Sequence, residues 1–154
     1  MADDNKPRPR VQLWTDGACL GNPGPGGWGY ILRHVKTGKQ RKDSGGENQT
    51  TNNRMEITDV IRGLSALHTA CEVDLCSDSQ YVLKAIKEWM PAWKKNNWIK
   101  KDKRPVANVD LWKQLDDLLQ KHTVTTSWTK GHAGHPENEE CDELASVQAR
   151  QHSD

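Results

Sequence analysis

Hydrophobic and polar residues alternate near the start of the chain, where VQLWTDG begins at Val11. A period of two residues predicts a strand with one buried face. After the turn GNPGPGG at 21–27, the run WGYILRHV at 28–35 predicts a second strand. The turn KTGK at 36–39 then leads the chain into a third strand at 40–48. Strands joined by such short turns form an antiparallel meander.

The spacing changes to that of a helix after the meander. Asn53 and Glu56 have the separation of a capping box, which predicts the helix start. Apolar residues then recur every three or four positions up to about His68, at Ile57, Val60, Ile61, Leu64 and Leu67. The first helix is therefore expected to pack one apolar stripe against the sheet.

The second half of the chain alternates strands with helices. EVDLCSDS at 72–79 predicts a fourth strand, and Ser79 is placed to cap a helix whose apolar side is Val82, Ala85, Ile86 and Trp89. Pro91 and a basic segment interrupt this pattern. Helical spacing returns from Leu111 to Leu119, TVTTSWT predicts a fifth strand, and Pro136 opens a last helix. This order predicts an α/β fold with a mixed sheet.

The length of 154 residues fits one domain with one core. No stretch of the sequence reaches the roughly 20 apolar residues of a membrane span. The start, MADDNKPRPR, lacks the apolar run of a signal peptide, so we interpret residues 1–10 as a flexible tail and the protein as cytoplasmic, with no membrane partner. The four cysteines lie far apart without a CxxC pair, which favours reduced thiols over disulfides.

Charge is unevenly distributed along the chain. The segment KKNNWIKKDKR at 94–104 carries six cations and one anion, whereas residues 131–149 hold five acids and no Lys or Arg. Opposite patches on a small domain indicate a polyanion bound in one place and a cation in another. Two solvated faces that happen to differ in charge would give the same pattern.

A short repeat brings two aspartates into the same phase. Residues 11–16 and 73–78 share the pattern V-x-L-x-[TS]-D, so both predicted strands end in an aspartate, Asp16 and Asp78. If the strands are parallel neighbours, both side chains lie on one face near the carboxyl ends, where α/β sheets bind ligands. Each aspartate alone would more simply be a turn or cap residue, but the matched pair favours a shared site.

Two further acids can approach this pair. Glu56 adjoins the apolar stripe of the first helix, although it could serve only as the capping acid, and Asp142 follows Cys141 on the last helix. Clustered carboxylates repel one another unless a cation neutralises them. All-oxygen ligation suits magnesium or manganese, and two such ions can bind the attacking and leaving oxygens of a phosphodiester.

The histidines of KGHAGHPENEECDELA raise the question of zinc instead. His132, His135 and Cys141 are residue types that bind zinc, but their spacing, H-x2-H-x5-C, matches no structural zinc pattern. We interpret His135, which precedes Pro136, as structural.

Four motifs together resemble those of the bacterial type-one ribonucleases H: TDGACLGNPGPGGWG, TTNNRMEI, DSQYV and KGHAGHPENEECDELA, in this order, from about Val11 to Ala149. The resemblance implies a ribonuclease H-like fold, a five-stranded mixed sheet flanked by helices, in a catalytic domain at 11–150. It also implies an endonuclease that cleaves the RNA strand of RNA/DNA hybrids by two-metal-ion hydrolysis, leaving 5′-phosphate and 3′-hydroxyl ends.

The resemblance also implies roles for single residues. The metal-binding and catalytic acids fall on Asp16, Glu56, Asp78 and Asp142, with two Mg²⁺ ions as cofactors and Mn²⁺ as an alternative. His132 falls on a mobile catalytic-loop histidine, which suits proton transfer because an imidazole titrates near neutral pH. No nucleotide cofactor is expected, because the glycine-rich turn lacks a following Gly-Lys-Ser/Thr. A monomer is expected.

Substrate contacts follow from the same resemblance. Groups that read RNA 2′-hydroxyls fall on Cys19, Asn22, Asn52 and Gln80, and a pocket for a DNA phosphate includes Thr51 and Asn52. A basic protrusion at about 89–107 would place Lys94, Lys95, Lys100 and Lys101 on phosphates, and Trp89 and Trp93 against DNA sugars. The two tryptophans could instead form the packed face of their helix.

Two other functions fit parts of the pattern. A nuclease of the same superfamily that acts on DNA junctions or during transposition would share the acidic cluster but not the basic protrusion. A hybrid-binding module without catalysis predicts no metal-dependent cleavage, which does not fit four intact carboxylates.

Overall fold

Five strands form one sheet in the order β3-β2-β1-β4-β5. The computed structural model describes residues 8–128 and 136–153. The strands are β1 (Arg10–Cys19), β2 (Gly24–His34), β3 (Gln40–Thr50), β4 (Glu72–Ser77) and β5 (Thr123–Trp128). β1, β2 and β3 are antiparallel, whereas β4 is parallel to both β1 and β5. The predicted meander and the mixed sheet are confirmed.

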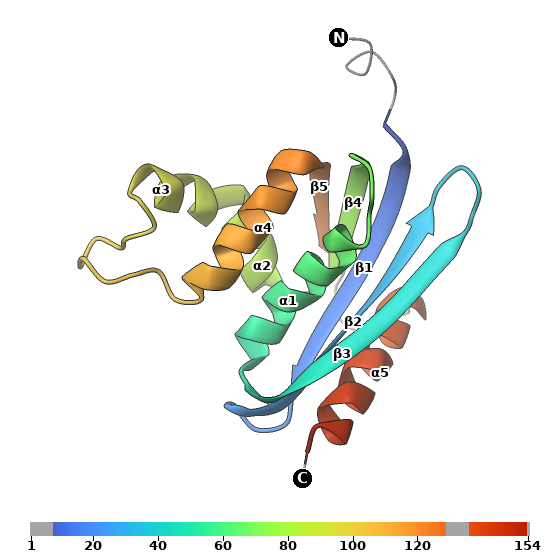
Figure 1. Ribbon diagram of the computed structural model, residues 1–154, viewed down its shortest axis with the longest axis horizontal. Helices are drawn as coiled ribbons and strands as arrows, with labels where there is room; N and C mark the ends of the chain where they lie inside the picture. The colour runs from blue at the N-terminus through green and yellow to red at the C-terminus, as the bar shows by residue number, and fades with distance from the viewer. Residues whose placement is uncertain (1–7, 129–135, 154) are drawn as a thin grey trace.

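Helices cover both faces of the sheet (Figure 1). They are α1 (Asn52–Ser65), α2 (Gln80–Lys84), the π-helical segment η2 (Ala85–Trp89), α3 (Met90–Lys95), α4 (Val109–Lys121) and α5 (Pro136–Gln151). Leu13 of β1 belongs to the main core together with α1 and α4, while its neighbour Trp14 packs with Cys141 of α5 on the other face. Successive side chains of a strand point to opposite faces, so β1 is buried between two helical layers.

The glycine-rich turn is shorter than the sequence predicts. β2 begins at Gly24 rather than at Trp28, so the predicted turn at 21–27 is wrong in its second half. Gly27 lies inside β2, where a Cβ would approach the Gln148 Cβ to 2.7 Å and the Ala149 backbone nitrogen to 2.8 Å. This glycine therefore allows α5 to pack closely on the sheet.

The start of α1 differs from the predicted capping box. Thr51, in an extended conformation, is the N-cap, and its hydroxyl accepts a hydrogen bond from the Arg54 N–H at 3.2 Å. Asn53 therefore lies inside the helix and is not its N-cap. Glu56 does not have the capping role that its spacing from Asn53 predicted. α1 ends at Ser65, before the predicted end near His68. The predicted cap of α2 is confirmed, because the Ser79 hydroxyl accepts from the Val82 N–H.

The sequence predicts that Pro91 interrupts the helical pattern, but the chain remains helical there. The chain stays helical from α2 through η2 to the end of α3 at Lys95. Pro91 lies in the first turn of α3, where proline is tolerated, and the wider π turn precedes it. The break comes only after Lys95, within the basic segment.

Arg8 and Pro9 contact the body of the domain. Arg8 Nη1 donates to the Thr123 hydroxyl at 3.0 Å, and the Pro9 carbonyl accepts from the Glu72 N–H at 2.9 Å. Residues 1–7 of the predicted tail lie outside the described part of the chain. All four cysteines are free thiols, as predicted. Among the described helices, none is long and apolar enough to cross a membrane.

Candidate metal centre and nucleic-acid surface

The repeated V-x-L-x-[TS]-D segments lie side by side. Val11 is paired with Val73 and Leu13 with Leu75 in the parallel ladder between β1 and β4. The two repeats are therefore in register, and Asp16 and Asp78 come at the same end of the sheet. The ladder ends at Trp14 and Cys76, although β1 continues to Cys19.

Three carboxylates meet just beyond the end of this ladder. Asp16, Glu56 and Asp78 each offer one oxygen, and these three oxygens all lie within 4.8 Å of one another. Glu56 reaches the group from α1 because residue 17 is glycine. A Cβ on Gly17 would lie 2.7 Å from the Met55 carbonyl carbon and 2.8 Å from the Glu56 nitrogen, so a larger residue would push α1 away.

Asp142 approaches Asp16 from the other helical layer. The Cys141 thiol donates to the Trp14 carbonyl at 3.4 Å and anchors α5 on β1. The next residue, Asp142, is half-buried, and its charge raises the pKa of Asp16, so the two carboxylates lie near each other. Asp142 is not a member of the group of three acids whose oxygens lie within 4.8 Å of one another.

The clustering changes the acidity of Asp16. Burial, followed by the charges of Asp78 and Asp142, raises the pKa of Asp16 to about 8. The Gly17 N–H, which donates to Asp16 Oδ1 at 2.9 Å, offsets only part of this effect. Without a cation, this carboxyl therefore keeps its proton near neutral pH.

Glu56 is 9% exposed, and its Oε2 has no hydrogen-bond partner among the described residues. Burial, with the charges of Asp16 and Asp78, raises the pKa of Glu56 well above its usual range. A hydrogen bond with the Ser79 side chain acts in the opposite direction. Between described residues, no ion pair involves Asp16 or Glu56.

These residues suit a hard divalent cation. Their donor atoms are all carboxylate oxygens, which magnesium and manganese prefer. A bound cation would also give the unpartnered Glu56 Oε2 an interaction partner. Cys141 is a poor zinc ligand, because its thiol is committed to the Trp14 carbonyl and burial raises its pKa far above the usual value. His132 and His135 lie outside the described residues.

Asp59 is a fifth acid near the site that the sequence predictions missed. It is fully buried, and neither carboxylate oxygen has a hydrogen-bond partner among the described residues. Burial, followed by the charges of Glu56 and Asp16, raises its pKa well above the usual range. The available signal was an acid within the apolar stripe of a helix, one turn after Glu56.

Glu140, two residues before Asp142, forms an ion pair outside the carboxylate cluster. Its carboxylate pairs with Lys42 of β3, and both side chains are partly exposed. The pair links α5 to the outer strand of the meander. An exposed pair of this kind contributes little stability, but it occupies Glu140 away from the carboxylate cluster.

Four of the predicted substrate residues meet where β1, β2, β3 and α1 converge. Asn22 Oδ1 accepts from the Asn52 N–H at 3.1 Å, and Thr51 caps α1 beside them. The Cys19 thiol donates to the Gly24 and Thr50 carbonyls at 3.5 and 3.6 Å. Gln80, the first residue of α2, is exposed and lies two residues after Asp78.

The tryptophans of the basic protrusion pack against one another. Trp93 lies 6.0 Å from Trp89, 6.4 Å from Trp98 and 5.7 Å from Trp112, measured between ring centroids. Trp112 is fully buried, whereas Trp89 and Trp93 are only half-buried. The rings therefore anchor the protrusion on the core and still present part of their surface to solvent.

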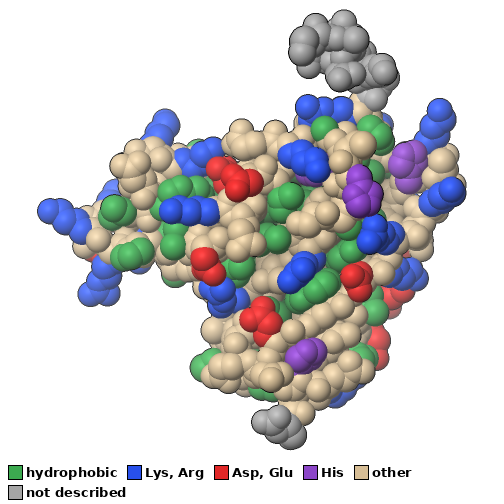
Figure 2. All heavy atoms as spheres, in the orientation of Figure 1, with side chains coloured by type: hydrophobic (Ala, Val, Ile, Leu, Met, Phe, Trp, Pro, Cys, Tyr) green, Lys and Arg blue, Asp and Glu red, His purple; other side chains and the backbone are tan. Residues whose placement is uncertain are grey.

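The basic side chains themselves extend into solvent. Figure 2 shows Lys and Arg side chains gathered at the protruding end of the molecule that follows α3. Lys95, Lys100 and Lys101 are exposed there, while Lys94 pairs with Asp116 at 3.1 Å.

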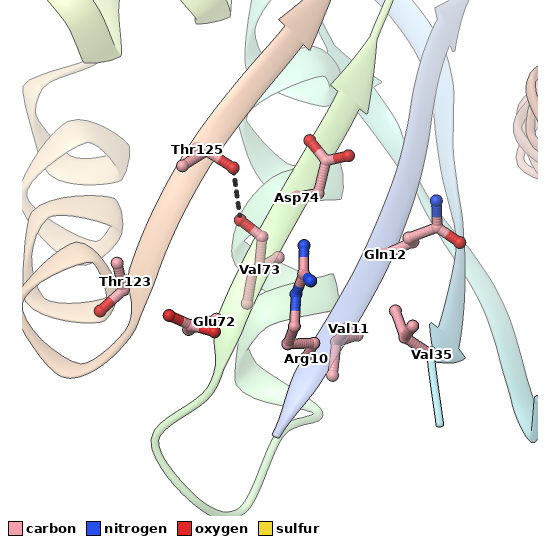
Figure 3. A pocket seen from close by; sticks show the side chains of 9 residues that line it. All are labelled: Arg10, Val11, Gln12, Val35, Glu72, Val73, Asp74, Thr123 and Thr125. Atoms are coloured by element: carbon pink, nitrogen blue, oxygen red, sulfur yellow. Dashed lines mark hydrogen bonds between the residues drawn. The ribbon is translucent and has the colours of Figure 1, made fainter. Parts of the chain in front are cut away.

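A cavity of about 480 Å³ lies at the other end of the sheet (Figure 3). It is lined by Arg10, Val11, Gln12, Val35, Glu72, Val73, Asp74, Thr123 and Thr125. These residues include the amino ends of β1 and β4, whereas Asp16 and Asp78 lie at the carboxyl ends. The cavity is therefore separate from the carboxylate cluster.

Comparison with known proteins agrees with this site. The family model described as RNase H matches residues 8–150. The chain is 54% identical over 145 residues to "Ribonuclease H" of Solibacter usitatus, covering 94% of this chain and 97% of that protein. It is 57% identical over 136 residues to "Ribonuclease H" of Hydrogenovibrio crunogenus, covering 88% and 92%.

Solved structures agree as well. LC9-RNase H1, described as a type 1 RNase H with the type 2 active-site motif, superposes with a TM-score of 0.85 at 31% identity, covering 96% of this chain and 75% of that one. LC11-RNase H1, solved in complex with an RNA/DNA hybrid, has the same fold, with a TM-score of 0.71 at 21% identity over 92% of this chain and 97% of that one. The chain therefore belongs to the RNase H family and is a hydrolase of the ribonuclease H class.

Proposed function

We propose that this enzyme hydrolyses the RNA strand of RNA/DNA hybrids internally, leaving 5′-phosphate and 3′-hydroxyl ends. One observation carries the proposal: Asp16, Glu56 and Asp78 place oxygens within 4.8 Å of one another, and the charge of Asp142 acts on Asp16. Such a group of acids is unfavourable by itself and becomes favourable around divalent cations. The high identity to bacterial proteins named Ribonuclease H supports the choice of substrate.

Asp16, Glu56, Asp78 and Asp142 would hold two Mg²⁺ ions, with Mn²⁺ as an alternative. Bound there, the ions would supply charge stabilisation to the phosphodiester and to the attacking and leaving oxygens. The carboxylates would position the cations, and Asp16 would give up the proton that it keeps near neutral pH without a cation. His132, in the segment outside the described residues, would transfer a proton near the scissile phosphate.

The hybrid would lie between two surfaces of the enzyme. Cys19, Asn22, Asn52 and Gln80 would contact RNA 2′-hydroxyls, and Thr51 with Asn52 would hold a DNA phosphate. Asn22 and Asn52 are already hydrogen-bonded to each other, which fixes their relative position before the substrate binds. Lys94, Lys95, Lys100 and Lys101 would contact phosphates without reading sequence, beside the half-buried rings of Trp89 and Trp93. The proposal includes a monomer that works in the cytoplasm.

A cleavage assay tests the proposal. Uniformly labelled RNA/DNA, RNA/RNA and DNA/DNA duplexes are incubated with the enzyme, with and without Mg²⁺, and the ends of the products are identified. We expect cleavage of the RNA/DNA hybrid alone, only with the metal. Cleavage of duplex DNA would favour a superfamily DNA nuclease, and hybrid binding without cleavage would favour a binding module. Size-exclusion chromatography tests the monomer.

A further inference from the structure

Asp59 lies one helical turn after Glu56 on α1. Residues three positions apart lie on the same side of a helix, so Asp59 faces the sheet as Glu56 does. Asp59 is 0% exposed, and among the described residues neither of its oxygens has a hydrogen-bond partner. A buried carboxyl without partners is costly, because it has given up water without replacing it.

The surroundings of Asp59 are acidic rather than basic. The charges that act on it come from Glu56, Asp16 and Asp78, all candidate metal ligands. The Val60 N–H lowers the pKa of Asp59, but it forms no hydrogen bond with the carboxylate oxygens. Asp59 also acts on Cys141, the residue before Asp142. Asp59 therefore lies close to Glu56 and Asp16, on the side of α1 that faces the carboxylate cluster.

We propose that Asp59 is a positioning residue of the metal centre, whose buried carboxylate strengthens the binding of a divalent cation by Asp16, Glu56 and Asp78 without being one of its ligands. This inference rests on the proposed function, because it requires a cation at that site. A negative charge on the fully buried Asp59 would attract the cation strongly, since little solvent screens it. The cation in turn provides the opposite charge that Asp59 otherwise lacks.

A purely structural role makes a different prediction. If Asp59 were only a neutral, buried polar group, its replacement would change the stability of the fold but would leave cation affinity unchanged. Outer-shell residues of metal sites typically change affinity by about 10- to 100-fold when they are replaced. Cation affinity, measured without any nucleic acid, therefore separates the two roles.

The experiment measures Mn²⁺ binding to the intact protein by the electron paramagnetic resonance signal of free Mn²⁺. It compares the wild type with Asp59→Asn, which keeps the shape of the side chain, and Asp59→Ala, which favours the helix. Asp74→Asn is the matched control. Asp74 lies on β4, toward the amino end of the strand and away from the carboxylate cluster, where its Oδ1 accepts from the Ser127 hydroxyl at 2.9 Å.

We expect both Asp59 variants to bind Mn²⁺ about 10-fold more weakly than the wild type, and Asp74→Asn to bind it as the wild type does. We also expect Mn²⁺ to raise the melting temperature of the Asp59 variants less than that of the wild type, which checks the result in whichever variant folds better. Wild-type affinity in both Asp59 variants would overturn the proposal.

Asp16→Asn distinguishes this failure from failure of the proposed function. If Asp16→Asn weakens Mn²⁺ binding and the Asp59 variants do not, the metal centre stands and only the role of Asp59 is wrong. If neither change affects Mn²⁺ binding, the carboxylate site is not a metal centre, and both proposals are wrong.

Discussion

Gly17 packs directly against Glu56, so that a Cβ on Gly17 would lie 2.8 Å from the Glu56 backbone nitrogen. This contact brings α1 close enough to β1 for the Glu56 carboxylate to meet Asp16. The approach of two backbones, rather than any side-chain contact, thus sets the position of one acid in the candidate metal centre.

Replacing Gly17 with alanine should separate α1 from β1. We expect a loss of about 1–3 kcal/mol in the free energy of unfolding, together with at least a tenfold loss of hybrid cleavage, because Glu56 moves away from Asp16. Urea unfolding and cleavage rates in Mg²⁺ measure the two effects. Gly38→Ala is the control, since Gly38 has a φ of +74° but nothing near its missing Cβ; it should lose stability and keep activity.

Asp16→Asn should retain hybrid binding and lose nearly all cleavage. The amide keeps the size of the side chain but cannot carry the negative charge that a divalent cation requires. Fluorescence anisotropy with a labelled hybrid measures binding, and the labelled-duplex assay measures cleavage. A variant that cleaves at near the wild-type rate in Mg²⁺ would contradict the proposed mechanism.

His122 should make the fold less stable in mild acid. It is 3% exposed, and its Nδ1 accepts from the Cys71 N–H at 3.0 Å, a bond that the protonated ring cannot accept. Burial, followed by the charges of Lys121 and Arg8, lowers the pKa of His122 in the folded protein. The unfolded chain therefore binds the proton more readily, so this contribution is present above about pH 6.5 and is lost as the pH falls below it.

Urea unfolding at pH 7 and pH 5 tests the role of His122. His122→Asn offers Oδ1 as the acceptor for the Cys71 N–H and does not titrate in this range, so its stability should fall less on acidification. An equal fall in both proteins would rule out His122 as the source.

Replacing Lys94, Lys95, Lys100 and Lys101 with alanine should weaken hybrid binding and reduce its salt dependence. Each lost phosphate contact lowers the slope of log K against log salt by roughly one unit. We expect Lys94 to contribute least, because Asp116 already pairs with it. Binding titrations across a salt series give the slope.

Lys36→Ala with Lys39→Ala, in the turn between β2 and β3, is the control for this series. Both lysines are exposed, but they lie outside the protrusion. An unchanged slope in the protrusion variant would remove that segment from the binding surface.

Local patterns predicted most of the elements correctly. The alternation in β1, the helical stripe of α1 and the Ser79 cap depend on neighbours in the chain, and the structure confirms all three. The repeat at 11–16 and 73–78 even predicted the register of two strands that are distant in sequence. Predictions failed where a local signal had two uses. Gly27 has the composition of a turn but serves helix packing, and Asn53 has the spacing of a cap that Thr51 provides instead.

The order of the elements, the shared phase of Asp16 and Asp78, and the resemblance to the ribonucleases H can all be read from the chain alone. The packed structure adds that Glu56 belongs to the acidic cluster rather than to a helix cap, and that Asp59 is fully buried one helical turn after it. Local spacing cannot show this, because burial and charge repulsion depend on distances between segments far apart in the chain. These distances arise only when β1, β4, α1 and α5 pack together.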